Sequence, residues 1–116
     1  MRRIYGVIFL TLLLGLSGCS SMVKDGAMIR ASNNYSDGDY EDTIEIVERS
    51  MHMYDYNDEE KSQLLFLKAL SFQKLGDVQT AYSVLKYITY KFPETEYGFR
   101  AATILESVSQ SADSSI

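Results

Sequence analysis

The stretch Ser62–Pro93, SQLLFLKALSFQKLGDVQTAYSVLKYITYKFP, decides the fold of this chain. Its apolar residues recur at the three- and four-residue spacings that place side chains on one stripe of a helix, and not at the period of two that a strand requires. Gly76 supplies a backbone that can end a helix, and Asp77 can cap the next one. Pro93 cannot continue that second helix. The stretch predicts two antiparallel helices, with apolar residues at Leu64, Leu65, Leu67, Leu70, Phe72 and Leu75 and then at Val78, Ala81, Tyr82, Leu85, Ile88 and Phe92.

The order of small and bulky residues in this hairpin resembles the tetratricopeptide repeat (TPR). In that family small residues lie where the two helices cross closely. Two positions differ from the family pattern, because Leu65 stands where Trp is common and Ile88 stands where a small residue is common. The resemblance implies an all-α stack of antiparallel helical hairpins. The residues that carry it are Ala69, Phe72, Gly76, Asp77, Ala81, Leu85 and Pro93.

The segment before this hairpin predicts a second, less regular copy of it. A Gly38-Asp39 turn corresponds to Gly76-Asp77, Ala31 corresponds to Ala69, and Thr43 corresponds to Ala81. The two turns are 38 residues apart, against 34 in the usual repeat, and four extra residues add about one helical turn. We therefore expect repeats at about 25–55 and 57–93, with Asp39 as a cap and Asn57 and Glu60 as a capping box.

The remaining parts of the chain flank this pair of repeats. Residues 95–108 predict a helix that closes the stack or is the first half of a truncated third repeat, so the domain at 25–108 has about five helices. Residues 109–116 are small and polar and predict a disordered tail. Two repeats and one helix make a short stack, because three repeats are the usual stable minimum. Its unsealed end leaves homodimerisation open.

The N-terminus predicts a signal for export. Arg2 and Arg3 precede an apolar run over residues 4–16, which is shorter than the ~20 residues of a spanning helix. Leu16-Ser17-Gly18-Cys19 is similar to the lipobox of bacterial lipoproteins. The resemblance implies removal of residues 1–18, covalent lipid including palmitate on Cys19, and a short lipidated tether at 19–24. Ser20, in place of Asp, implies the outer membrane, facing the periplasm. A plain secretory signal with a chance cysteine is the alternative.

Charge and cysteine content exclude several classes of function. Cys19 is the single cysteine, so the chain forms no internal disulfide and holds no cysteine-ligated metal. Removal of Arg2 and Arg3 lowers the basic residues from 11 to 9 against 16 acidic residues, a net charge of -7. That balance argues against binding to nucleic acid or to anionic membrane surfaces.

No combination of residues predicts catalysis. His52 lies between Met51 and Met53, but three side chains on one helix do not converge on a metal ion. The acidic runs at 37–39 and 55–60 lack the order of an EF-hand, and we interpret them as turns and caps. Phosphate-binding and hydrolase motifs are absent from the sequence. We expect no enzyme, no metal and no cofactor beyond the lipid on Cys19.

Two surfaces are candidates for binding a partner. The TPR resemblance implies a groove along the first helices of the repeats, at Met28, Ser32, Tyr35, Gln63, Phe66, Leu70 and Gln73. Core packing could instead occupy Phe66 or Leu70. Tyr87 and Tyr90, with Lys86 and Lys91 nearby, form a second candidate. These tyrosines could contact a protein, stack on sugar rings, or pack against an adjacent helix.

Longer segments resemble the same family. The lipobox, GDYEDTIEIVE and KFPETEYGFRAA together are similar to small TPR lipoproteins of the bacterial envelope. The last segment is similar to the sequence motif at the end of a repeat in the BamD-type lipoproteins of outer-membrane assembly. The resemblance implies a non-catalytic adaptor for other envelope proteins, in assembly or secretion. The alternative is an accessory factor of exopolysaccharide export or cell-wall assembly that contacts carbohydrate.

Overall fold

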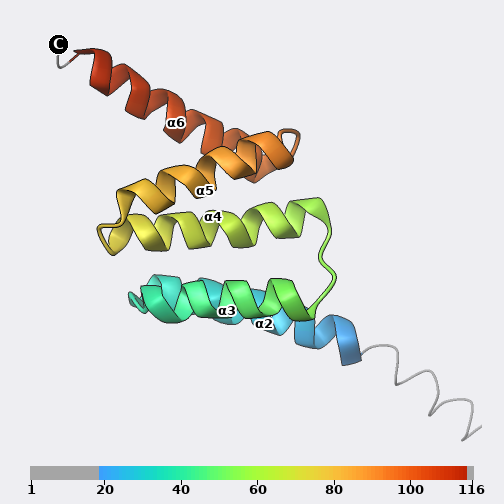
Figure 1. Ribbon diagram of the computed structural model, residues 1–116. Coiled ribbons are helices and arrows are strands. Elements are labelled where there is room, and N and C mark those ends of the chain that lie inside the picture. The colour runs from blue at the N-terminus through green and yellow to red at the C-terminus, as the bar shows by residue number, and fades with distance from the viewer. Residues whose placement is uncertain (1–18, 115–116) are drawn as a thin grey trace, which may run out of the picture.

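The computed structural model describes residues 19–114, with side chains from Met22 onward. The described residues form α-helices joined by short turns, with no strand among them (Figure 1). The all-α prediction and its five helices are confirmed. The signal peptide predicted for residues 1–18 lies outside the described residues. The helices are α2 (Cys19–Asp37), α3 (Tyr40–Met53), α4 (Asp58–Lys74), α5 (Val78–Lys91) and α6 (Glu96–Ser114).

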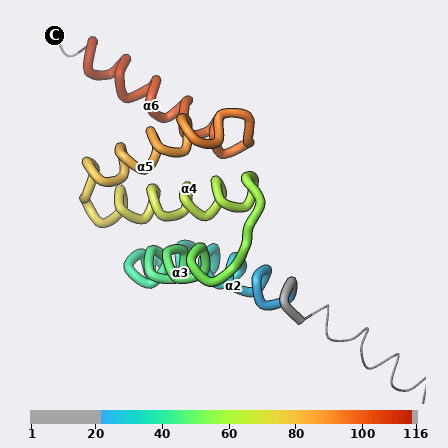
Figure 2. Tube along the Cα trace, turned by 45° about the vertical axis from the view of Figure 1, so that its right-hand side comes forward, coloured from blue at the N-terminus to red at the C-terminus, as the bar shows by residue number. Residues whose placement is uncertain are grey.

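The helices form two hairpins, α2 with α3 and α4 with α5, and α6 packs against the second (Figures 1 and 2). α4 lies in the middle and contacts each of the other four helices. Such a helix needs apolar residues on more than one face. Neighbouring Leu64 and Leu65 meet this need by pointing into two different clusters of buried residues.

The two hairpin turns have the same conformation. Gly38 and Gly76 adopt left-handed φ angles of 85° and 86°, which a residue with a Cβ seldom takes. The amide of Asp39 donates to the Asn34 carbonyl at 2.8 Å, and Asp77 donates to the Phe72 carbonyl at 2.9 Å. Each turn is therefore a Schellman motif, and the predicted correspondence between the two turns is confirmed.

The predicted caps differ in outcome. Asn57 and Glu60 form the capping box, because each accepts a hydrogen bond from the backbone amide of the other at 2.9 Å. Asp77 accepts from the Thr80 amide at 3.2 Å. Asp39 precedes α3, but its side chain forms no cap hydrogen bond. Its backbone angles match those of Asp77, so backbone conformation does not explain the difference.

Small residues lie where the helices cross. Ala31, Thr43, Ala69 and Ala81 are all buried, as predicted from their matching positions in the two hairpins. The first cluster comprises Ala31, Val47, Tyr56 and Leu64. The second cluster comprises Leu65, Phe66, Ala69, Leu85, Ile88, Phe92 and Ala101.

The predicted tether at residues 19–24 and the predicted disordered tail at 109–116 are wrong where the structure describes them. α2 is helical from Cys19, and α6 continues to Ser114. In α2, Lys24 is held by contacts with the α3–α4 connection. In α6, serine hydroxyls donate to carbonyls one turn earlier, as Ser111 does to Ser107 at 3.0 Å. Residues 115–116 lie outside the described residues.

The first turn of α5 is less buried than its pattern predicted. Val78 and Tyr82 belong to the apolar stripe of α5, yet both are exposed. α6 crosses α5 near their shared turn and then diverges from it, as Figure 1 shows. Val78 and Tyr82 therefore stay exposed, although Ala81 beside them is buried. The stripe predicted the side of α5 that faces the core but not how far the neighbouring helix extends over it.

Candidate functional site

The predicted groove residues do not form one open binding surface. Met28, Ser32, Tyr35, Gln63 and Leu70 are half-buried, and Gln73 is exposed. Leu70 packs against the second cluster, and the ring of Tyr35 lies edge-on against Tyr40 with centroids 5.5 Å apart.

Phe66 packs in the core, which is the alternative that the sequence left open for it. It is only 8% exposed, and its ring centroid lies 5.4 Å from that of Tyr97. Tyr97 belongs to α6, which packs against α4 on this side. The closing helix therefore covers Phe66, because it lies on α4 as well as on α5. A partner that binds beside α4 meets Gln63 or Gln73 but not Phe66.

The α5 tyrosine patch is the better exposed of the two predicted surfaces. Tyr90 lies on the side of α5 opposite the buried Ala81, Leu85 and Ile88, and Tyr82 and Lys91 flank that side. Tyr90 is 85% exposed, and Tyr87 is also exposed, with its ring edge-on to Phe92. We define the patch as Tyr82, Lys86, Tyr87, Tyr90 and Lys91.

The charge of α5 sets this patch apart from the rest of the chain. α5 contains Lys86 and Lys91 and no acidic residue, although residues 19–116 carry a net charge of -7. The ammonium of Lys86 lies 4.9 Å from the centroid of the Tyr82 ring, a cation–π contact that orients both side chains. The patch therefore presents aromatic rings and positive charge together.

Pockets lie beside α5 and between α2 and α3. An apolar pocket of about 50 Å³ opens where α6 diverges from α5, and it includes exposed Val78, Tyr82 and Val108 and the predicted Gln73. A pocket of about 220 Å³ between α2 and α3 contains Arg30 and Arg49. Arg49 forms an ion pair with Glu45.

The residues weighed for metal chemistry do not come together. His52 is exposed, Met51 packs against both buried clusters, and Met53 points to solvent. Within residues 19–114, no group of three or more His, Cys, Asp or Glu side chains is placed to hold a metal ion. Over the same range, no helix has the length and apolar character needed to cross a bilayer.

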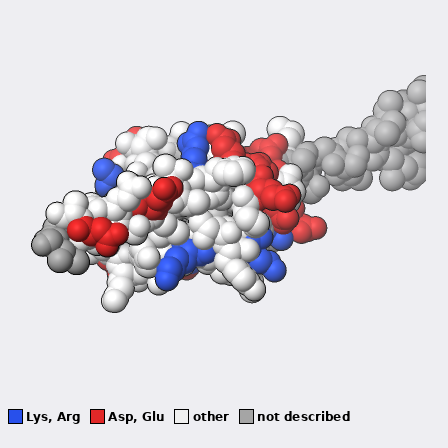
Figure 3. All heavy atoms as spheres, turned by 90° about the horizontal axis from the view of Figure 1, so that it is seen from above, with Lys and Arg blue, Asp and Glu red and all other residues white. Residues whose placement is uncertain are grey.

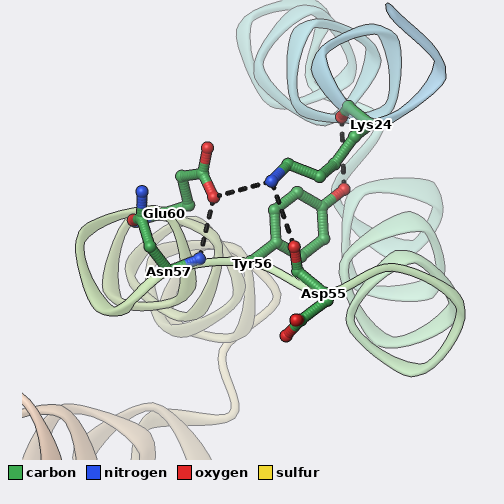
Figure 4. A network of polar contacts seen from close by, with 5 residues as sticks. All are labelled: Lys24, Asp55, Tyr56, Asn57 and Glu60. Atoms are coloured by element: carbon green, nitrogen blue, oxygen red, sulfur yellow. Dashed lines mark hydrogen bonds and ion pairs between the residues drawn. The ribbon is translucent and has the colours of Figure 1, made fainter. Parts of the chain in front are cut away.

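A polar network joins α2 to the α3–α4 connection, and the sequence did not predict it (Figure 4). The Lys24 ammonium donates to the Asp55 carbonyl at 3.0 Å and pairs with the Glu60 carboxylate at 3.3 Å. It also lies 5.2 Å from the centroid of the Tyr56 ring. The Tyr56 hydroxyl donates to the Lys24 carbonyl at 3.2 Å. We call these contacts of Lys24, Asp55, Tyr56 and Glu60 the Lys24 network.

Only one part of the Lys24 network, the position of the Glu60 carboxylate, was predictable from the sequence. The capping box with Asn57 holds the Glu60 carboxylate, and the spacing of those two residues predicted it. Lys24 and Tyr56 are 32 residues apart, and no local pattern relates them. The network therefore depends on the folding of α2 against α3 and α4.

Tyr56 gives the fold a dependence on alkaline pH. Burial raises the pKa of the Tyr56 hydroxyl above its ordinary value of 10.0, because the phenolate loses hydration. The unfolded chain therefore ionises first, and the stabilising contribution is complete below pH 10 and is lost as pH rises through the raised pKa. We expect the urea midpoint of the natural chain to fall as the pH rises above 10, and the urea midpoint of Tyr56→Phe to fall less. Equal declines in both chains would contradict this assignment.

No protein-family model, curated protein or solved structure matches the chain. The resemblance to TPR lipoproteins therefore stays a prediction from the sequence. The structural features that bear on function are the helical stack, the exposed α5 tyrosine patch and the helical conformation of residues 19–24 in α2.

Proposed function

We propose that this protein is a non-catalytic adaptor of the bacterial envelope, anchored by lipid on Cys19 to the periplasmic face of the outer membrane. In this proposal it holds another envelope protein in assembly or secretion. The α5 tyrosine patch is the observation that carries the proposal. Partner binding needs a stable surface with exposed anchoring side chains, and the hairpin stack supplies a rigid support for such a surface.

The chemistry of the patch suits a protein partner. Tyrosine is enriched at protein interfaces, because one end of the side chain is apolar and the other forms hydrogen bonds. Lys86 and Lys91 add positive charge, which favours a partner with an acidic surface. The rest of the chain is acidic and would repel such a partner elsewhere. Charge therefore directs the partner to α5.

The binding prediction compares crosslinking at two exposed positions. We expect a photo-crosslinking residue at Tyr90 to capture one envelope protein in cells, identified by mass spectrometry. A crosslinker at Ile29, an exposed apolar residue on α2, should not capture it. With that protein purified, Tyr87→Ser and Tyr90→Ser together should weaken binding about thirtyfold or more, because anchoring residues each contribute upward of ~1 kcal/mol. Equal capture at both positions would contradict the proposal.

The anchoring prediction concerns Cys19. We expect labelled palmitate to be incorporated into the natural chain and not into Cys19→Ser, which should also leave the membrane fraction. The reason is that attachment depends on acyl chains, each buried methylene contributing about 0.8 kcal/mol. Label that persists in Cys19→Ser would contradict lipidation at this residue.

Contact with carbohydrate is the second candidate function, as an accessory factor of exopolysaccharide export or cell-wall assembly. The exposure of Tyr87 and Tyr90 favours it, since open aromatic rings can stack on sugars. The chain has no tryptophan, so tyrosine fluorescence reports directly on such contacts. If envelope glycans perturb this fluorescence in the natural chain but not in the double tyrosine variant, the carbohydrate function is favoured over the adaptor.

A further inference from the structure

The helix α2 leaves no flexible segment between the lipid site and the folded stack. Cys19 is the first residue of α2, and the helix continues without a break through Lys24. Five residues of helix span about 8 Å along its axis. A helix of this length is far stiffer than the glycine- and serine-rich linkers that behave as random coils.

The Lys24 network fixes the direction of this short helical segment. The contacts come from three sides: a carbonyl at Asp55, a carboxylate at Glu60 and the ring of Tyr56. Tyr56 is itself buried in the first cluster, against residues of α2, α3 and α4. The start of α2 therefore moves with the stack and not independently of it.

Two exposed apolar side chains lie beside the lipid site. Met22 is 74% exposed and Val23 is 50% exposed, three and four residues after Cys19. They lie within about 6 Å of it along the helix axis. A membrane interface is the environment that removes such side chains from water when the neighbouring residue carries acyl chains.

Carboxylates limit how much of the molecule enters the bilayer. The starts of α4 and α6 lie at the same end as the Lys24 network, because the Glu96 amide donates to the Glu59 carboxylate at 3.0 Å. Figure 3 shows red carboxylates gathered towards this right-hand end of the view. Burial of carboxylates in lipid is strongly unfavourable, so this end stays in water. The carboxylates of this end are Asp55, Asp58, Glu59, Glu60, Glu94 and Glu96.

We infer that α2 is a rigid mount, which places Met22 and Val23 in the lipid headgroup region and holds the α3–α4 connection towards the bilayer. The inference rests on the proposed lipidation of Cys19. The Gly38 and Gly76 turns then point away from the membrane, about 26 Å further along α4. α5 runs back towards the membrane end, so a partner on Tyr90 is held beside the bilayer.

The experiment uses single tryptophans in a chain that has none. Met22→Trp and Leu75→Trp place a probe at each end, the second at a residue 45% exposed beside the Gly76 turn. The lipidated protein is reconstituted in phosphatidylcholine vesicles with brominated acyl chains. We expect a large loss of fluorescence for Met22→Trp and none for Leu75→Trp.

The matched control inserts a flexible Gly-Ser-Gly-Ser segment between Ser21 and Met22. We expect the insertion to lower the fluorescence anisotropy of Leu75→Trp, because the domain then rotates freely about the anchor. Unquenched Met22→Trp on vesicle-bound protein, or anisotropy that the insertion leaves unchanged, would overturn the rigid mount while the lipid anchor stands. Protein that carries no lipid and does not bind vesicles would overturn both proposals.

Discussion

Replacing Leu64 with alanine is expected to lower the free energy of unfolding by about 2–5 kcal/mol, the range for truncating a buried leucine. Leu64 has no exposed surface and packs with Ala31, Val47 and Tyr56. Its neighbour Leu65 packs in the second cluster, so α4 joins the two clusters. The cavity at residue 64 would therefore loosen the contact between the hairpins. Urea unfolding followed by circular dichroism, on the chain that begins at Cys19, measures the loss.

Leu75→Ala is the matched control for Leu64. Leu75 is an exposed residue at the C-terminal end of the same helix, next to the Gly76 turn. Exposed substitutions change stability by about 0.5 kcal/mol or less. If both variants lost the same stability, the two-cluster packing around α4 would be wrong.

Gly98→Ala is expected to lower the free energy of unfolding by about 1–3 kcal/mol, the range for overpacking a buried site. A Cβ at Gly98 would overlap the carbonyl oxygen of Phe92 and lie 3.0 Å from the Thr95 hydroxyl oxygen. Neither group can move freely. The Thr95 hydroxyl donates to the Phe92 carbonyl at 2.8 Å and accepts from the Gly98 amide at 2.9 Å. The added methyl group would push the start of α6 away from α5.

Gly26→Ala is the matched control for Gly98. Gly26 lies inside α2, and a Cβ there meets nothing within 4 Å. Alanine is favoured over glycine in a helix interior by about 1 kcal/mol, so this variant should be slightly more stable than the natural chain. Opposite signs for the two substitutions are expected in the same unfolding assay. A stabilising Gly98→Ala would contradict the close approach of α6 to Phe92.

Local features of the helices were predictable from the sequence. The Gly38 and Gly76 turns depend on left-handed backbone angles that glycine tolerates, and the capping box of Asn57 and Glu60 depends on a three-residue spacing. Burial of Ala31 and Ala69 followed from their matching distances to those turns. Each of these features involves residues within about two helical turns of one another, so a short sequence pattern contains them.

Contacts between distant segments were not predictable in this way. By sequence, Phe66 fitted either an open groove or the core, and α6 covers it through Tyr97, which is 31 residues away. Val78 and Tyr82 belong to a buried stripe by period, but α6 diverges before it covers them. In both cases the deciding quantity is the angle at which α6 crosses α4 and α5. That angle results from packing many side chains together.

The sequence alone determined the helices, their turns and the small residues at the crossings, because backbone angles and side-chain spacing are local properties. The tertiary structure alone decided that residues 19–24 are a helix held by Lys24 and Tyr56, and that Tyr87 and Tyr90 remain open to solvent. A salt bridge or a buried ring joins residues that lie far apart in the chain. Such contacts form only after folding has brought the two segments together, so no local sequence pattern contains them.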